Sequence, residues 1–92
     1  MNLTNDMVHH PNHYNILGRK ECFEEMLENF GAEAVRNFCL LNVYKYHYRS
    51  DFKNGNEDIK KAENYADKFL EMGGNPHLLT KAVTKARGGL NE

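Results

Sequence analysis

The sequence predicts an all-α fold: a small helical domain of three to four helices with a central antiparallel hairpin and an extended N-terminal arm. Apolar residues recur at spacings of three and four along most of the chain, which is the period of an amphipathic helix. Glycine, asparagine and proline separate these stretches, where helices begin and end. No stretch alternates as a strand does. Ninety-two residues are enough for one core, so we expect residues 1–92 to form a single domain.

The arm is predicted at residues 1–19, which lack helical periodicity and contain proline, glycine and several asparagines. The core helices are expected within residues 20–72. The first, from residue 20 to 30, should end at Gly31, a residue typical of helix C-termini. The second should run from residue 32 to 49.

The hairpin turn is predicted at residues 50–56, SDFKNGN. Its last residue, Asn56, is expected to cap the third helix, because asparagine accepts hydrogen bonds from the first free amides of a helix. Two glycines after residue 72 should end that helix. Asn75 and Pro76 match the preferences of the first positions of a helix, so a C-terminal helix is predicted at residues 75–88. Its apolar face could dock on the body or on another subunit.

The composition excludes several classes of protein. The chain carries 12 basic and 13 acidic residues, so its bulk charge favours neither nucleic acid nor a membrane surface as a partner. No segment is long and apolar enough for a signal peptide or a membrane span, and the expected location is the cytoplasm. Cys22 and Cys39 lie apart in apolar-patterned segments and are expected to be small buried residues in a reducing compartment. A chain this short also favours self-association.

Polar residues interrupt the apolar stripe of the second helix. The stripe begins with Val35 and Cys39 and continues through Asn42, Tyr46 and Arg49. A buried polar group needs a partner, since leaving it unpaired costs about 1–3 kcal/mol. One interpretation is that Arg49 pairs with an aspartate of the facing helix and holds the turn together.

The other interpretation is a phosphate site. Arg49, Lys45 and Lys53 could converge on phosphate oxygens, since arginine offers a planar fork and lysine a mobile charge. Asp58 and Glu57 would then orient these cations or hold Mg²⁺ through water. The tyrosines could offer a flat surface to a base, although tyrosines at helical spacing more often belong to a core.

The N-terminal arm is rich in histidine. His9, His10 and His13 fall within five residues, but Pro11 disfavours a helical conformation at the residue before it, so the spacing of a helical metal pair is not expected. We therefore predict no metal site. Instead, Pro11 is expected to stiffen the arm and lay His13 and Tyr14 against the helical body, where they could cap the phosphate pocket or form part of its wall.

Three blocks of sequence carry a resemblance. HPNHYN at residues 10–15, NVYKYHYR at 42–49 and KNGNEDIKKAENY at 53–65 resemble the SaV-like family of small tailed-phage proteins, a domain of unknown function. The resemblance implies a phage accessory protein in the cytoplasm of an infected bacterium. A larger podovirus relative is described as a nucleotide kinase without a conventional phosphate loop, and other relatives are linked to sensitivity to host abortive-infection systems.

The resemblance selects the same polar residues as the phosphate interpretation. The chain has no GxxxxGK[ST] motif, so P-loop chemistry is excluded. A nucleotide kinase must bind two nucleotides, and 92 residues are few for two such sites unless the sites lie between subunits of a homo-oligomer. We therefore favour nucleotide binding over phosphoryl transfer. No catalytic residue is assigned. The expected phosphate-binding residues are His10, His13, Tyr14, Asn42, Lys45, Tyr46, Arg49 and Lys53. Structural or orienting roles are expected for Glu57, Asp58, Lys61 and Tyr65.

Two alternatives stay open. The chain could instead be a non-enzymatic protein that engages a host or phage protein and modulates host defence, with the polar residues only building the hairpin. An acidic run, with Glu24, Glu25 and Glu28, also matches the first half of the magnesium-binding signature of all-α nucleotide pyrophosphatases. Its second half is not matched, because Glu63 and Asp67 are one residue too far apart, and a solvated acidic face is the simpler interpretation.

Overall fold

The computed structural model describes residues 21–52 and 54–89, and this part of the chain contains helices and no strand. In order they are α1 (Cys22–Arg49), α2 (Gly55–Glu71) and α3 (Pro76–Ala86). The prediction of an all-α fold is therefore confirmed. The predicted arm at residues 1–19 lies outside the described residues. Among the residues that are described, no helix combines the length and the apolar character needed to cross a membrane.

The chain divides into two compact units, residues 1–35 and 36–92, and each is described by itself. In the first unit, α1 is interrupted at Gly31, whose φ of 88° and ψ of 166° are not helical. Only glycine adopts such a φ without strain, so the predicted break at this residue is confirmed, although the helix resumes directly after it. Val35 is buried, whereas Cys22 is exposed. The predicted burial of Cys22 is therefore wrong: this thiol precedes the apolar stripe and lies on the outer side of the first turn.

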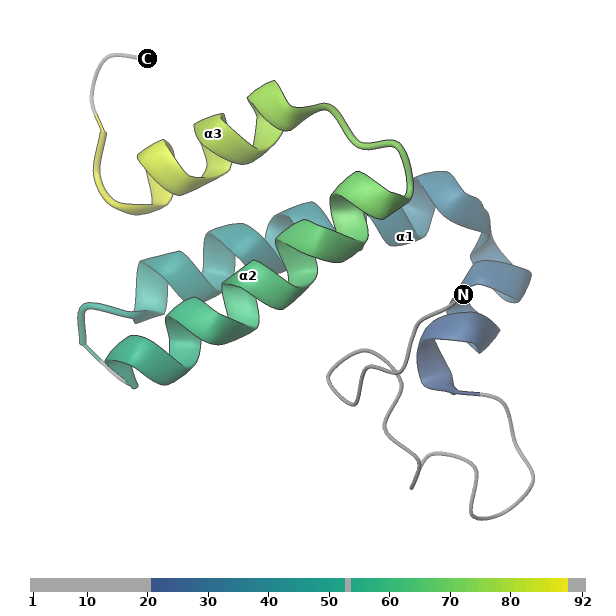
Figure 1. Cartoon of the computed structure of the whole chain (residues 1–92), viewed down its shortest axis with the longest axis horizontal. Helices are drawn as coiled ribbons and strands as arrows, with labels where there is room; N and C mark the ends of the chain where they lie inside the picture. Colours follow the sequence, from purple (N-terminus) through teal and green to yellow (C-terminus); the bar gives the residue numbers. More distant parts are fainter. Residues whose placement is uncertain (1–20, 53, 90–92) are drawn as a thin grey trace. The chain divides into compact units, whose positions relative to one another are not determined.

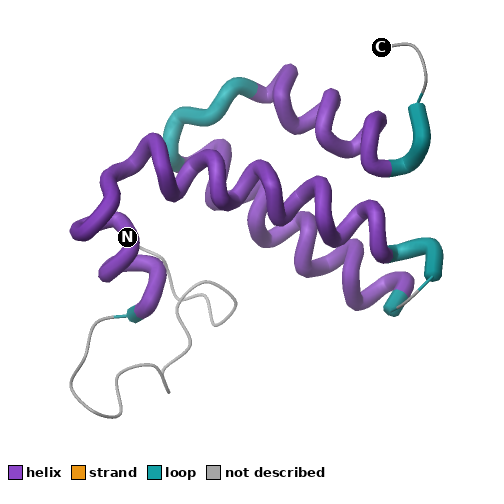
Figure 2. Tube along the Cα trace, turned by 180° about the vertical axis from the view of Figure 1, so that it is seen from behind, coloured by secondary structure: helices purple, strands orange, loops and turns teal. Residues whose placement is uncertain are grey.

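In the second unit, the later half of α1 and α2 lie side by side and run in opposite directions (Figures 1 and 2). Three contacts show this order. The Arg36 guanidinium donates to the Met72 carbonyl over 3.1 Å, near the end of α2. The rings of Phe38 and Tyr65 meet edge to face at 5.7 Å. At the far end of α1, an ion pair joins this helix to the first turn of α2.

All three helices contribute to the core of the second unit. The buried apolar residues lie one or two turns apart on each helix, so each helix presents one face: Cys39 and Val43 on α1, Ala62 and Phe69 on α2, and Ala82 and Ala86 on α3. Phe38 on α1 and Leu70 on α2 are 40% and 44% exposed. The core of the second unit therefore combines one large ring, Phe69, with small side chains from all three helices.

The helix ends are decided by local hydrogen bonds. At α3, the Asn75 side chain accepts from the His77 amide over 2.9 Å, and Pro76 is the first helical residue, as predicted. At α2, the capping position is Asn54 and its side chain makes no capping bond, so the prediction of Asn56 as the cap is wrong. Instead, the buried carboxylate of Asp58 accepts from the Asn54 amide over 3.3 Å.

Candidate anion-binding site

Three cationic side chains surround the ring of Tyr46. The Lys45 ammonium lies 4.5 Å from the ring centre, the Arg49 guanidinium carbon 5.4 Å and the Lys61 ammonium 5.5 Å. All three distances are within the range of a cation–π contact. Lys45 and Arg49 lie one turn apart on α1, and Lys61 lies on α2. The packing of the two helices therefore brings the three cations together. We call Lys45, Arg49 and Lys61 the cation cluster.

The Tyr46 ring is held by other aromatic side chains. Its plane lies within 10° of that of Tyr65 on α2, with ring centres 6.0 Å apart. Tyr65 in turn receives the edge of Phe38 at an interplanar angle of 84°. Stacked and edge-to-face pairs each contribute about 0.5–1.5 kcal/mol beyond their buried area. The ring at the centre of the cation cluster is therefore a fixed part of the contact between the helices.

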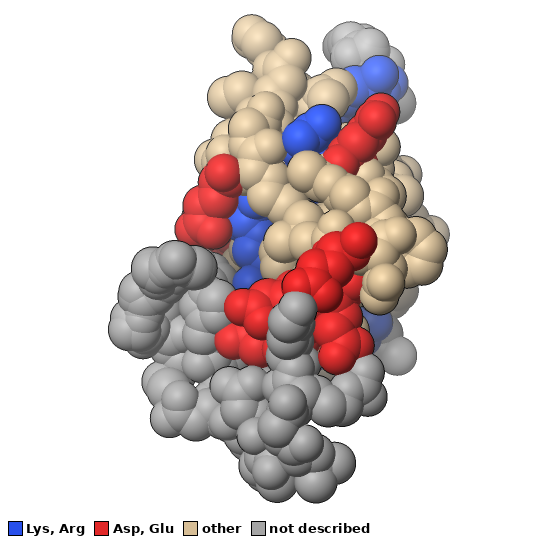
Figure 3. All heavy atoms as spheres, turned by 90° about the vertical axis from the view of Figure 1, so that its right-hand side faces the viewer, with Lys and Arg blue, Asp and Glu red and all other residues tan. Residues whose placement is uncertain are grey.

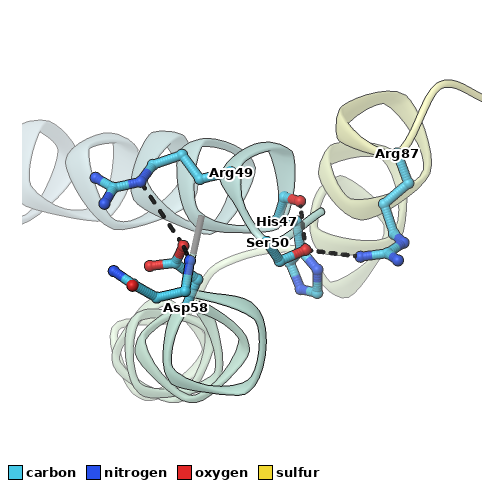
Figure 4. A network of polar contacts seen from close by, with 6 residues as sticks. His47, Arg49, Ser50, Asp58 and Arg87 are labelled. Atoms are coloured by element: carbon cyan, nitrogen blue, oxygen red, sulfur yellow. Dashed lines mark hydrogen bonds and ion pairs between the residues drawn. The ribbon is translucent and has the colours of Figure 1, made fainter. Parts of the chain in front are cut away.

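Arg49 also forms the ion pair of the first of the two interpretations drawn from the sequence. Its Nε lies 3.7 Å from Oδ2 of Asp58, which is fully buried, whereas the arginine side chain is 30% exposed. This ion pair is made through Nε. At 3.7 Å it is too long for a hydrogen bond, and Nε has no hydrogen-bond partner in the described part of the chain. Figure 4 shows that the two terminal nitrogens of the guanidinium point away from Asp58. Arg49 thus joins the helices with Nε and keeps its paired NH₂ groups directed elsewhere.

The local charge is strongly positive. Lys45, Arg49 and Lys61 carry three positive charges, and Asp58 is the carboxylate paired with them, so these four side chains together carry a charge of +2. A phosphomonoester carries about −1.5 to −2 near neutral pH. Lysines and an arginine fork are the side chains that proteins use to bind such groups. The cluster can therefore neutralise one phosphate group.

Asp58 has further capacity to accept a hydrogen bond. Its Oδ2 is used by Arg49 and the Asn54 amide, but its Oδ1 is buried and has no hydrogen-bond partner. Leaving such an oxygen unpaired costs about 1–3 kcal/mol. Buried acceptors of this kind are places where an ordered water gains a hydrogen bond.

A second polar group joins α3 to the end of α1. Arg87 donates through Nη1 to the Ser50 hydroxyl at 3.1 Å, and its Nη2 lies 3.4 Å from Oδ1 of Asp51. The Ser50 hydroxyl donates to the His47 carbonyl over 2.8 Å (Figure 4). Since Arg87 follows directly after α3, these bonds attach the C-terminal helix to the body of its own unit. The sequence left open whether the C-terminal helix docks on the body of its own chain or on another subunit. These contacts show that it docks on its own chain.

Burial changes the acidity of two groups near these helices. The pKa of His47 is lowered from 6.5, first by burial and then by the positive charge of Arg87, while Glu63 opposes the shift. Its Nδ1 is buried without a hydrogen-bond partner. Burial also raises the pKa of the Cys39 thiol to about 11, against a smaller opposing effect of Lys68. Both groups are therefore neutral at physiological pH.

The structure brings together some of the residues selected from the sequence and separates others. Lys45, Tyr46, Arg49, Asp58, Lys61 and Tyr65 form one site. Asn42 is buried one turn earlier on α1, where its amide donates to the Phe38 carbonyl over 2.9 Å. Glu57 is exposed. The other predicted residues, His10, His13, Tyr14 and Lys53, lie outside the described part of the chain.

Two contributions were not foreseen from the sequence. Lys61 was expected only to orient other groups, yet its ammonium belongs to the cation cluster. Its spacing of three residues from Asp58, which places both on one face of α2, is the signal that could have found it. Arg87 was not considered at all, and no local pattern marks it, because its partners Ser50 and Asp51 are more than 35 residues away.

Acidic side chains gather on the face of the molecule shown in Figure 3, with lysine and arginine side chains close by. Glu24 and Glu25 belong to the first turn of α1, where negative charge stabilises the helix. Within residues 21–52 and 54–89, no three His, Cys, Asp or Glu side chains form a group that could hold a metal ion.

Comparison with known proteins gives a family and a relative. Residues 8–67 match DUF3310, described as a protein of unknown function. The Gene 1.7 protein of Enterobacteria phage T3 is 36% identical over 66 residues, which cover 67% of this chain and 40% of the relative. The chain thus spans about two fifths of the length of this curated relative. No solved structure matches. The matched segment contains the whole candidate site and ends before α3.

Proposed function

The chain belongs to the DUF3310 family and is a phage protein of unknown function, and we propose that it binds a nucleotide or a nucleotide-derived phosphate ligand at the cation cluster. One observation carries this proposal: three cationic side chains lie within 5.5 Å of a single tyrosine ring, with one buried carboxylate to balance them. Such a concentration of like charge is unfavourable without a counter-ion. A phosphate group supplies that counter-ion.

The positions of the side chains support a division of roles. Arg49, oriented by Asp58, offers its terminal nitrogens to two oxygens of one phosphate group. Lys45, which is exposed, and Lys61, which is half-buried, bind the remaining oxygens as mobile charges. Asp58 is fully buried and acts on the ligand only through Arg49.

The remaining predicted residues join this proposal on the sequence pattern and the resemblance. His10, His13, Tyr14 and Lys53 would line the same pocket, and Asn42 supports it from the core by fixing the α1 backbone. Phosphoryl transfer is the further step that the resemblance suggests, with a nucleoside monophosphate as acceptor. Magnesium would then enter with the phosphates of the donor, because Mg²⁺ is commonly bound through one or two carboxylates and substrate phosphates.

A thermal-shift screen of the full chain tests the proposal. Inorganic phosphate and nucleoside mono-, di-, tri- and cyclic phosphates are each added with and without Mg²⁺. A ligand that binds only the native state raises the melting temperature once its concentration exceeds its Kd. We expect a phosphate-dependent shift that unphosphorylated nucleosides do not produce. A flat screen at millimolar ligand would overturn the proposal and favour the non-enzymatic role, in which the chain engages a host or phage protein.

Variants of the cation cluster locate the site. Lys45→Gln and Lys61→Gln should each weaken binding about tenfold, because each removes one charge-assisted hydrogen bond to phosphate. Lys60→Gln is the matched control, since Lys60 neighbours Lys61 on α2 and is exposed. If Lys60→Gln weakens binding as much as Lys61→Gln, the effect is one of overall charge and the site is wrong. Only a chain that passes this test warrants an assay for phosphoryl transfer from a nucleoside triphosphate.

A further inference from the structure

One face of α1 exposes large apolar side chains that no described residue covers. Leu41 is 67% exposed, Tyr44 40%, Tyr48 54% and, just beyond the helix, Phe52 63%. The aromatic members touch one another: Tyr44 and Tyr48 are stacked at 6.4 Å, and Phe52 meets Tyr48 edge to face at 5.5 Å. We call these four residues the α1 seam. A continuous apolar surface of this kind marks an interaction site.

The spacing of the α1 seam is that of a helix pair. Leu41, Tyr44 and Tyr48 follow at intervals of three and four, and the exposed Asn37 extends this pattern by four residues toward the N-terminus. Alternating intervals of three and four keep one stripe facing a second helix along its length. A helix with the same intervals is the surface that fits it, and a second copy of this chain carries such a helix by definition.

A hollow beside the α1 seam gives the pairing its register. It has a volume of about 230 Å³ and is lined by Leu40, Leu41 and Tyr44 of α1 and by Leu78, Lys81, Ala82 and Lys85 of α3. This equals roughly seven or eight water molecules, which is room for an aromatic side chain. If a second α1 crosses in the opposite direction with its Tyr48 against Leu41, the reciprocal contact forms at the same time, because the two positions exchange under a two-fold axis near Tyr44.

The area of the α1 seam is close to the lower limit for a stable dimer. Taking about 200 Å² for a fully exposed side chain of this kind, the α1 seam leaves about 450 Å² of apolar surface open per copy. Burying it in both copies, together with Leu78, which is 41% exposed, and the stems of the lysines that line the hollow, approaches the roughly 1,200 Å² at which stable interfaces begin.

We propose that this protein forms a two-fold symmetric dimer through antiparallel pairing of the α1 seams, in which Tyr48 of each copy enters the hollow between α1 and α3 of the other. The lysines at the hollow then meet the hydroxyl end of the incoming ring. Tyr46 lies two positions from both Tyr44 and Tyr48, about 200° around the helix, so the ring at the centre of the cation cluster faces away from this interface. Lys45 lies four residues after Leu41 and three before Tyr48, at the edge of the α1 seam. The α1 seam and the cation cluster share no residue, so the two proposals are tested by different variants.

Sedimentation equilibrium of the full chain tests the dimer. We expect the wild type to dimerise and Tyr48→Glu and Leu41→Glu each to raise the dimer dissociation constant about 100-fold, as for central anchors of an interface. Both side chains are more than half exposed, so neither change should unfold the chain, which circular dichroism checks. Leu70→Glu is the matched control, because Leu70 is an exposed leucine of α2 away from the α1 seam.

Cross-linking tests the direction of the helices. In a Cys22→Ser background, which removes the exposed thiol, Leu41→Cys and Tyr48→Cys chains are prepared separately, mixed and treated with a short bismaleimide. Antiparallel pairing predicts cross-links between unlike chains. A monomeric wild type, a dimer that tolerates both glutamates, a dimer equally disrupted by Leu70→Glu, or cross-links only between like chains would each overturn the proposal.

Discussion

Arg49 and Asp58 form an ion pair whose two members should differ in their importance for stability. Asp58 is 0% exposed and Arg49 is 30% exposed, with 3.7 Å between Nε and Oδ2. Substituting one residue of the pair leaves the charge of the other residue unpaired. An unpaired carboxylate at the Asp58 position cannot reach water, whereas an unpaired Arg49 can turn toward it. Loss of the arginine should therefore destabilise the fold more than loss of the aspartate.

The structure sets the size of each effect. Arg49→Met keeps most of the side-chain volume against Tyr46 and should cost about 3 kcal/mol, at the lower end of the range for a broken buried pair, because the Asn54 amide and the N-terminus of α2 still stabilise the carboxylate. Asp58→Asn keeps the shape and an acceptor for that amide and should cost about 1–2 kcal/mol. For a domain of this size, 3 kcal/mol lowers Tm by roughly 15 °C.

Urea unfolding followed by circular dichroism measures both effects, at one fixed protein concentration because self-association would change the apparent stability. The double variant Arg49→Met/Asp58→Asn should be less destabilised than the sum of the single variants by at least about 1 kcal/mol. Lys45→Met is the control, since Lys45 is an exposed cation over the same ring and its loss should cost under about 1 kcal/mol. Equal costs for the two single variants, or strict additivity, would refute this reasoning.

Three further predictions follow from burial. A thiol reagent should modify Cys22 alone in the native protein and both cysteines in denaturant, because Cys39 is buried with its pKa raised to about 11; two fast-reacting thiols in the native state would contradict this. Gly74→Ala should destabilise the second unit by about 1–3 kcal/mol, since a Cβ there would collide with the ring of the fully buried Phe69, and a wild-type Tm would show that the ring yields. The third concerns His47, whose pKa is lowered from 6.5 by burial, so the unfolded state binds its proton more readily and stability should be lost as the pH falls below that value. His47→Gln should flatten the Tm-against-pH profile there, whereas an unchanged slope would exclude this histidine.

Several features of this protein were determined by local sequence. The start of α3 could be predicted because Asn75 accepts from the His77 amide and Pro76 fixes its own φ near the helical value. The break at Gly31 follows from the backbone freedom of a single glycine. The opposition of Arg49 and Asp58 was also foreseeable, since a short turn between two helices places the last turn of one beside the first turn of the next. These features depend on neighbours in sequence, and the chain's order of residues is sufficient to specify them.

Other features were decided only when the helices packed. Asp58, rather than an asparagine side chain, stabilises the first turn of α2 because packing buries its carboxylate. Lys61 contacts Tyr46 because α2 packs beside α1. Arg87 donates to Ser50 because the end of α3 lies near the end of α1. An apolar pattern in the sequence shows that one face of a helix can be buried, but it does not identify the helix or chain that covers that face. Which face of α1 is buried against α2 and α3, and which stays open as the α1 seam, is therefore a property of the tertiary structure.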